Sequence, residues 1–384
     1  MESSDPMGRT PGRVLLNGNA ESIERFVHLA DVGLGPSRHR DPSVRDRDTM
    51  QICTGAWGPG ELDDAPIRRH LAAAGRGGGG EHIGNLALWT AVQRFLKQRR
   101  VVRQLFDEHE AAWWDLFNDY SAENGATVAN LRAAWERTLQ RFPDVTMPRL
   151  LSRGHQRPPG PRTRPVSVFL RDGAGGALQR AVAGLREADA RHAALLRDLW
   201  QHFQIAAGLE FDPLWQEHRT RLANDILSAS AILLPGGSPS RLLLGFRFYR
   251  LEGVLAEALR RGTSFFGTSA GAMVLGRRIV IFNDRAQPRQ EFQLLDNGVR
   301  LVEGLQVFPH VTDRVQTEDT ANLAYLSARF DNRRCVGLNQ GSVLALAPEG
   351  GRWAGRSVGE EDVVVFGRDG NKLRYAPGDE VRFA

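Results

Sequence analysis

The chain has 384 residues, 41% hydrophobic and 25% charged, which is enough apolar content for a sizeable core, and a formal net charge of +5. No run of about 18 apolar residues predicts a membrane-spanning helix, and the N-terminus has neither the basic start nor the apolar stretch of a secretory signal. The positive charge is nearly all arginine interleaved with Asp and Glu. We therefore expect a cytoplasmic protein that binds neither nucleic acid nor membrane. Cys53 and Cys335 lie far apart in apolar runs, so we predict buried free thiols rather than a disulfide framework or a metal site.

The first 82 residues predict the start of an α/β domain. Residues 1–11 are expected to form a disordered tail, and residues 14–19 and 50–57 are apolar runs typical of strands. Four glycines at 77–80 then interrupt the chain. They lack the Gly-Lys-Ser/Thr ending of a phosphate-binding loop, so we interpret them as a flexible connection. We assign residues 12–82 to the N-terminal part of the α/β domain.

A mostly helical insertion is predicted over residues 83–220. Apolar residues recur there at three- and four-residue spacing in three stretches, residues 83–142, 177–204 and 213–228. Between the first two stretches lie a linker rich in Pro, Arg and Gly and a short predicted strand, at residues 143–165 and 166–170. A Trp-rich stripe in the first stretch indicates a packing surface rather than a substrate box. The insertion could cap the functional site or form the interface of a homo-oligomer.

Residues 221–384 predict the C-terminal part of the α/β domain, which carries the candidate site. An apolar strand at 231–234, a helix at 240–261 and a strand at 264–266 alternate, which is typical of a parallel sheet. Later strands are expected near the end of the chain, at residues 336–338, 342–346 and 362–366, with hairpins near 350–351 and 369–370.

The sequence Gly267-Thr268-Ser269-Ala270-Gly271 follows the strand at 264–266 and opens a run of small residues. A Gly-x-Ser-x-Gly pattern between a strand and a helix is typical of a nucleophile elbow, whose tight turn requires small flanking residues. Ser269 would project from the end of the strand, and the backbone N–H of Ala270 would point at a developing oxyanion. An ordinary glycine-rich turn would show the same pattern.

Two residues downstream could complete a catalytic triad. A serine nucleophile needs an adjacent base that is oriented by a carboxylate. Asp284 and His310 each follow an apolar, strand-like run, and catalytic groups gather at the carboxyl ends of strands in open α/β sheets. Asp284 could instead be a turn former and His310 a loop histidine. Glu291 and Asp296 are competing candidates for the acid.

These residues resemble the dipeptidase E/cyanophycinase family of serine peptidases. The elbow GTSAGA at 267–272 matches the family's elbow, and the pairs Asn283-Asp284 and Pro309-His310 match the segments that carry its acid and histidine. The upstream Leu-Pro-Gly-Gly at 234–237 also matches. The resemblance implies a three-layer αβα, flavodoxin-like parallel sheet and a serine-type peptidase that uses no metal and no cofactor.

The resemblance also implies roles for further residues. The backbone N–H groups of Gly237 and Ala270 would form the oxyanion hole, and Arg241, Arg314 and Gln340 are candidates for binding the substrate. The chain departs from the family pattern at Ser238, where the family has Asn, and at Gln340, where it has an acid. We expect hydrolysis of an amide bond in a small peptide or peptide-like substrate, next to an aspartyl residue, through an acyl-enzyme on Ser269. An acyl or amide transferase and a non-catalytic binding module are the alternatives.

Overall fold

The computed structural model describes residues 11–34, 49–56, 82–141, 175–282, 292–330, 334–349, 352–367 and 369–383. Several sequence predictions fall outside these residues. They are the disordered tail up to residue 10, the glycine run at 77–80, the linker at 143–165 and the short strand at 166–170.

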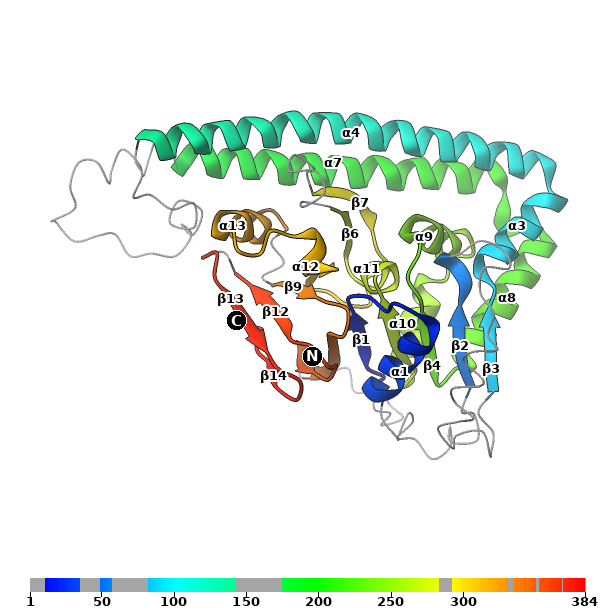
Figure 1. The fold of residues 1–384 in the computed structure, drawn as a ribbon. Coiled ribbons are helices and arrows are strands. Elements are labelled where there is room, and N and C mark those ends of the chain that lie inside the picture. Colours follow the sequence, from blue (N-terminus) through cyan, green and yellow to red (C-terminus); the bar gives the residue numbers. More distant parts are fainter. Residues whose placement is uncertain are drawn as a thin grey trace.

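An eight-stranded sheet forms the centre of the molecule (Figure 1). Five strands pair in parallel in the order β1-β5-β4-β2-β3, namely β1 (Val14–Asn17), β5 (Ser264–Thr268), β4 (Ala231–Leu234), β2 (Thr49–Cys53) and β3 (His82–Leu86). Three antiparallel strands extend the sheet beyond β1, namely β10 (Val343–Glu349), β11 (Arg352–Ser357) and β14 (Glu380–Val381). The predicted α/β class with a mainly parallel sheet is confirmed.

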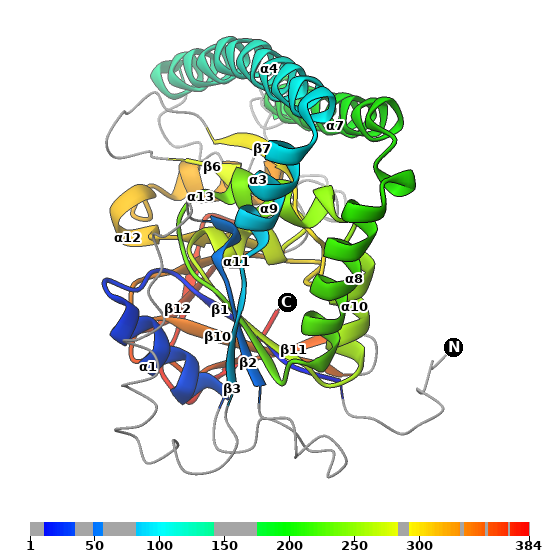
Figure 2. The ribbon, with the colours of Figure 1, turned by 90° about the vertical axis from the view of Figure 1, so that its right-hand side faces the viewer.

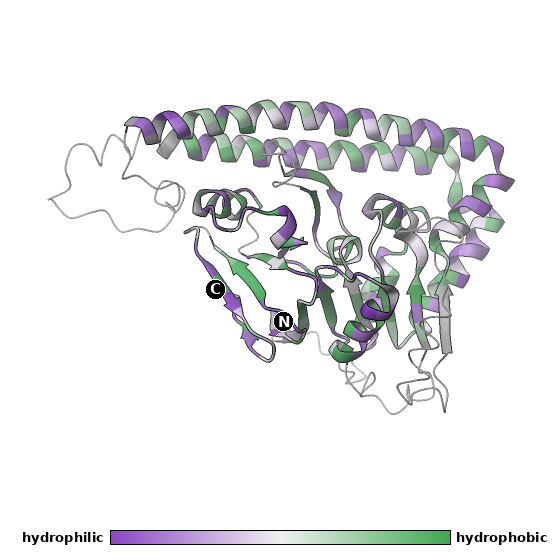
Figure 3. Cartoon of the chain, in the orientation of Figure 1, coloured by the Kyte–Doolittle hydropathy of each residue, from purple (hydrophilic) through white to green (hydrophobic). Residues whose placement is uncertain are grey.

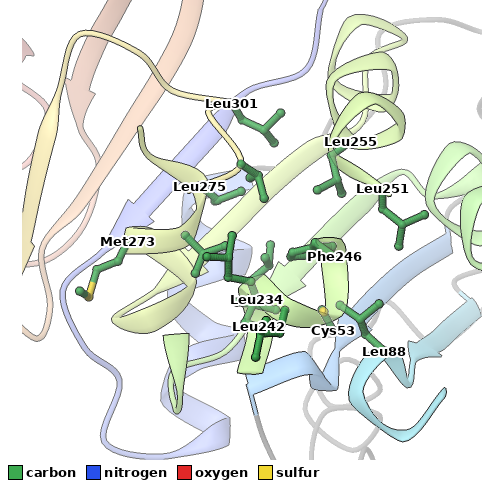
Figure 4. Close-up of a cluster of buried hydrophobic side chains, with 14 of the residues drawn as sticks. Cys53, Leu88, Leu234, Leu242, Phe246, Leu251, Leu255, Met273, Leu275 and Leu301 are labelled. Carbon is green, nitrogen blue, oxygen red and sulfur yellow. The ribbon is translucent and has the colours of Figure 1, made fainter. Parts of the chain in front are cut away.

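Helices cover both faces of this sheet, because alternate strand residues point to opposite sides. Leu15, Leu233 and Phe266 pack on one face against α1 (Ile23–Leu34). Their neighbours Leu16 and Leu234 pack on the other face, with Phe265, in a larger cluster (Figure 4). This cluster includes residues of α9 (Pro239–Phe248), α10 (Glu252–Arg260) and α11 (Ala270–Leu275). Figure 2 shows α1 on one side of the strands and α8 (Pro213–Ser228) with α10 on the other. The layers are therefore αβα, as the resemblance implied.

Two local predictions are wrong. Residues 82–86 form the edge strand β3 rather than the start of a helix, paired in parallel with β2. A short apolar run is compatible with strand or helix, and only pairing decides between them. The helix expected over 240–261 is broken into α9 (Pro239–Phe248) and α10 (Glu252–Arg260). Arg250 takes a left-handed backbone (φ 50°) at the break, which turns the fully buried Leu251 into the core.

A second, four-stranded sheet has the order β13-β12-β9-β8, with β8 and β9 parallel. Its strands are β8 (Gln306–Pro309), β9 (Cys335–Leu338), β12 (Val363–Phe366) and β13 (Lys372–Tyr375), and it is accompanied by α12 (Val311–Arg314) and α13 (Thr320–Arg329). β6 (Arg278–Ile281) and β7 (Gln293–Asn297) form an antiparallel pair. The late strands are confirmed, and so are the two hairpins, because β10 pairs with β11 and β12 with β13.

The predicted helical stretches form α3 (Leu88–Gln98), α4 (Arg100–Arg141), α7 (Gly175–Ala207) and α8. α4 and α7 lie side by side across one end of the molecule, over β7 and α13 (Figure 1), and both alternate hydrophobic and hydrophilic residues along their length (Figure 3). Trp89 and Trp113 are buried in the core, so the aromatic stripe is a packing surface as expected.

A buried polar cluster fastens this helix pair to the rest of the protein. Arg329 of α13 is fully buried and donates to both carboxylate oxygens of Asp189 of α7, at 2.7 and 3.1 Å. Its guanidinium also donates to Asn124 Oδ1 of α4 at 2.7 Å. The hydroxyl of Tyr120, also on α4, donates to Asp189 at 2.6 Å and accepts from the backbone N–H of Leu294 in β7 at 3.0 Å. Four elements therefore meet at one ion pair.

Cys53 and Cys335 are both buried thiols outside any disulfide, as predicted, and burial raises the pKa of the Cys53 thiol to about 12. None of the helices in the described parts of the chain combines the length and the apolar character that crossing a membrane requires.

Candidate active site

Ser269 lies at the point where the central strand β5 ends and α11 (Ala270–Leu275) begins. Its backbone is left-handed, with φ 48° and ψ −109°, a conformation that costs free energy for a residue with a side chain and is characteristic of functional turns. A Cβ on Gly267 would lie 2.7 Å from the carbonyl carbon of Gly271, and a Cβ on Gly271 would lie 2.2 Å from the carbonyl oxygen of Leu234. Both glycines are therefore sterically required, so the turn has the tight geometry expected of an elbow.

His310 reaches Ser269 from the other sheet. It follows β8 and precedes α12, with a left-handed backbone of its own (φ 54°, ψ 37°). The distance between Ser269 Oγ and His310 Nε2 is 2.7 Å, a hydrogen bond within the reach that base-assisted attack requires. The structure thus brings together two residues 41 positions apart, on elements of different sheets.

The surroundings of His310 favour its neutral form. Burial lowers the pKa of the imidazole to about 4, the positive charge of Arg314 acts in the same direction, and Asp313 opposes them. A neutral imidazole at pH 7 can accept a proton from a hydroxyl, whereas an imidazolium cannot.

The two charged neighbours should move the pH dependence of activity in opposite directions. Arg314→Gln removes the cation, so it should raise the pKa of His310 and shift the acid limb of kcat/KM to higher pH. Asp313→Asn removes the anion, so it should shift the same limb to lower pH. The pH profile of kcat/KM reports this group in the free enzyme. A shift of both variants in the same direction would contradict this account of His310.

The acid of the predicted triad, Asp284, lies outside the described residues, and so does its rival Glu291. Asp296 is described, and it is engaged elsewhere. Its buried carboxylate forms a two-pronged ion pair with Arg247, with Nη1–Oδ2 and Nη2–Oδ1 distances of 2.5 and 3.0 Å. A carboxylate held in this way on another cation is not free to orient His310, which leaves Asp284 and Glu291 as candidates.

The Gly-Gly segment after β4 lies against the serine. A Cβ on Gly236 would be 3.4 Å from Ser269 Cβ, and Gly237 has a positive φ of 129°. Ala270 is the first residue of α11, where backbone N–H groups have no partner within the helix. Of the two predicted oxyanion-hole residues, Ala270 therefore follows the serine directly, and Gly237 follows the glycine that lies beside it.

The structure describes all three candidate substrate-binding residues. Arg241 and Arg314 are exposed, on α9 and α12, and the charge of Arg314 acts on His310. Gln340 is half-buried in the loop after β9, and its backbone carbonyl accepts from Asn17. Ser238, which stands where the family has Asn, caps α9 by accepting from the N–H of Arg241.

Sequence reasoning missed Asn17 and Asn339. Asn17 ends β1 directly beside Thr268, and Asn339 follows β9. The available signal was a polar residue at the end of a buried strand, the same signal that indicated Asp284 and His310. Among the described residues, no cluster of three or more His, Cys, Asp and Glu side chains could hold a metal ion.

The model of peptidase family S51 matches residues 183–352, which include the elbow and His310. The resemblance to the dipeptidase E/cyanophycinase family is thereby confirmed over this part of the chain.

Two further proteins are similar to the chain. The pyridoxal 5′-phosphate synthase subunit PdxT of Kosmotoga olearia is 30% identical over 118 residues, which cover 30% of this chain and 57% of that protein. The chain thus matches little more than half the length of this relative. The crystal structure of a peptidase from an acI-B1 Actinobacterium aligns with a TM-score of 0.43 at 13% identity, over 98% of each chain.

Proposed function

We propose that Ser269 is the nucleophile and His310 the general base of a hydrolase that cleaves an amide bond in a small peptide. The 2.7 Å contact between Ser269 Oγ and His310 Nε2 is the observation that carries this proposal. His310 Nε2 takes the hydroxyl proton as Oγ attacks the substrate carbonyl, and it then gives this proton to the leaving amine as the acyl-enzyme forms. Water repeats the sequence to release the acid. Asp284 would orient the imidazole and stabilise its protonated form.

The N–H groups of Gly237 and Ala270 would stabilise the oxyanion of each tetrahedral intermediate. Gly236 places the backbone of the Gly-Gly segment beside Ser269. Such donors are fixed before the reaction begins, so they require no reorganisation as charge develops.

We further propose that the substrate carries a carboxylate near the scissile bond, as in an aspartyl or isoaspartyl dipeptide. The exposed guanidinium of Arg314 lies close enough for its charge to act on His310, and that of Arg241 lies on the helix that follows the Gly-Gly segment. Guanidinium groups bind carboxylates through two parallel hydrogen bonds, which would fix the substrate's orientation.

Two measurements test this function. A fluorophosphonate should form an adduct that peptide mapping locates on Ser269, and a dipeptide panel should show turnover of aspartyl or isoaspartyl peptides in preference to alanyl peptides of the same length.

The variant Arg314→Gln tests the role of this guanidinium in binding the substrate. It should raise KM for the acidic peptides and leave KM for the alanyl peptides little changed. An adduct on another residue, or none, would refute the mechanism. Equal turnover across the panel would refute only the substrate class, and amide products formed from an added amine would indicate acyl transfer.

A further inference from the structure

The short helix α12, on which His310 stands, is capped from outside its own segment. The first N–H groups of a helix need acceptors, which the residue preceding the helix usually supplies from its side chain. His310 occupies that position but makes no such bond, because its imidazole faces Ser269. Asn339 takes over this task. Its Oδ1 accepts from the N–H of Thr312 at 3.0 Å and also from the Thr312 hydroxyl.

The loop that carries Asn339 is itself held by the strand next to the elbow. Asn17 is fully buried, and its Nδ2 donates to the backbone carbonyls of Gln340 and Ser342 at 3.0 and 2.8 Å. The N–H of Asn339 donates to Ser342 Oγ at 3.0 Å, and this hydroxyl donates to the carbonyl of Asp362 at 2.6 Å. The position of Asn339 is therefore fixed from several sides.

Asn17 also binds the elbow. Its side-chain oxygen accepts from the hydroxyl of Thr268, and its backbone carbonyl accepts from the N–H of Ser269 at 3.1 Å. A continuous hydrogen-bonded path therefore runs from Ser269 through Asn17, the loop 339–342 and Thr312 to the turn of His310. The loop packs closely enough against Gly18 that a Cβ there would lie 2.1 Å from the carbonyl oxygen of Asn339.

We propose that Asn339, anchored by Asn17, is a positioning residue that holds the His310 turn at hydrogen-bonding distance from Ser269; this inference rests on the proposed function. The backbone of His310 lies in the left-handed region, which the surrounding structure must maintain. The Asn339 cap supplies that constraint across two segments of the chain. Without it, the first turn of α12 loses an acceptor and the imidazole can move away from Oγ. A misplacement of about 1 Å can cost about 100-fold in rate.

The test compares Asn339→Ala with Asn339→Asp, whose carboxylate keeps the acceptor for Thr312. We expect Asn339→Ala to lower both kcat and the rate of fluorophosphonate labelling by about 100-fold. KM should change little, because the oxygen of this side chain is bonded to Thr312. Asn339→Asp should restore most of the rate. Gly18→Ala should lower the rate as well, because its methyl group displaces the loop while every polar side chain of the path stays in place. Gly253→Ala is the control, since a Cβ there meets nothing within 4 Å on the exposed surface of α10.

The outcomes separate this inference from the proposed function. Wild-type protein that is not labelled at Ser269 would refute the function and this inference with it. Labelled wild-type protein with an Asn339→Ala rate within twofold of wild type would refute the positioning role alone. An Asn339→Asp variant as slow as Asn339→Ala would also refute that role, because the acceptor would then be irrelevant. Thermal unfolding of each variant shows whether the fold is intact.

Discussion

Replacing Ser269 by alanine is expected to lower kcat by about 10⁵- to 10⁶-fold, because members of a catalytic triad act as a unit and the loss of the nucleophile removes covalent catalysis altogether. The N–H of Ala270 and the backbone of the Gly-Gly segment remain, so substrate binding should change much less than turnover. The fold should stay intact, because alanine keeps the Cβ of residue 269 and loses only the hydroxyl, which bonds to His310. Steady-state kinetics and thermal unfolding measure the two effects.

Two further variants test whether the loss of turnover comes from the Ser269–His310 pair. His310→Ala should be as slow as Ser269→Ala, and the double variant should be no slower than either, since the hydroxyl and the imidazole share one proton transfer. Ser228→Ala removes a serine at the end of α8, whose hydroxyl bonds only locally to the carbonyl of Asp225, and should turn over as the wild type does. More than about 1% residual turnover in Ser269→Ala would mean that another group attacks the substrate.

Breaking the buried ion pair should have the largest effect on stability. Arg329→Met leaves the carboxylate of Asp189 without its cation in a site where only 4% of that side chain is exposed. Removing one partner of such a pair typically lowers the free energy of unfolding by about 3–5 kcal/mol. Because the cluster joins α4, α7, α13 and β7, we expect the loss to appear in global unfolding by urea at pH 7.

Two controls test whether stability is lost because a buried ion is left unpaired, rather than because an ion pair is broken. The double variant Arg329→Met with Asp189→Leu should be more stable than either single variant, because an uncharged apolar pair leaves no unpaired ion in the core. Arg191 and Glu123 form a pair between the same two long helices, with 63% and 58% of their side chains exposed. Arg191→Ala should change stability by less than about 1 kcal/mol, as exposed pairs do. A similar loss in both arginine variants would contradict this interpretation.

The sequence predicted those parts of the site that have a local signature. The elbow at Ser269 and the strand end at His310 could be read from apolar runs followed by a polar residue, and the structure brings the two side chains together. The break between α9 and α10 could not be predicted from the sequence, because the burial of Leu251 depends on the sheet beneath it. Asn17 and Asn339 were missed for a related reason. Their role follows from bonds to residues more than 20 positions away, which spacing along the chain does not reveal.

The acid remains a prediction from the sequence. Asp284 and Glu291 both lie outside the described residues, whereas Asp296 is excluded by its pairing with Arg247. Tyr120 and Asn124 bind the backbone of Leu294 and Phe292 at the start of β7. The long helices therefore fasten the chain directly after the segment that holds both remaining candidates.

The left-handed backbones of Ser269 and His310 also limit how this protein can adapt to heat. Each residue is held in a conformation that an isolated chain would avoid, so the rest of the domain supplies the free energy that keeps them there. Selection for thermotolerance alone would favour glycine at these two positions, and by the proposed mechanism each such change would abolish activity. Heat-adapted versions of this protein should therefore gain stability at other positions, with these two turns unaltered.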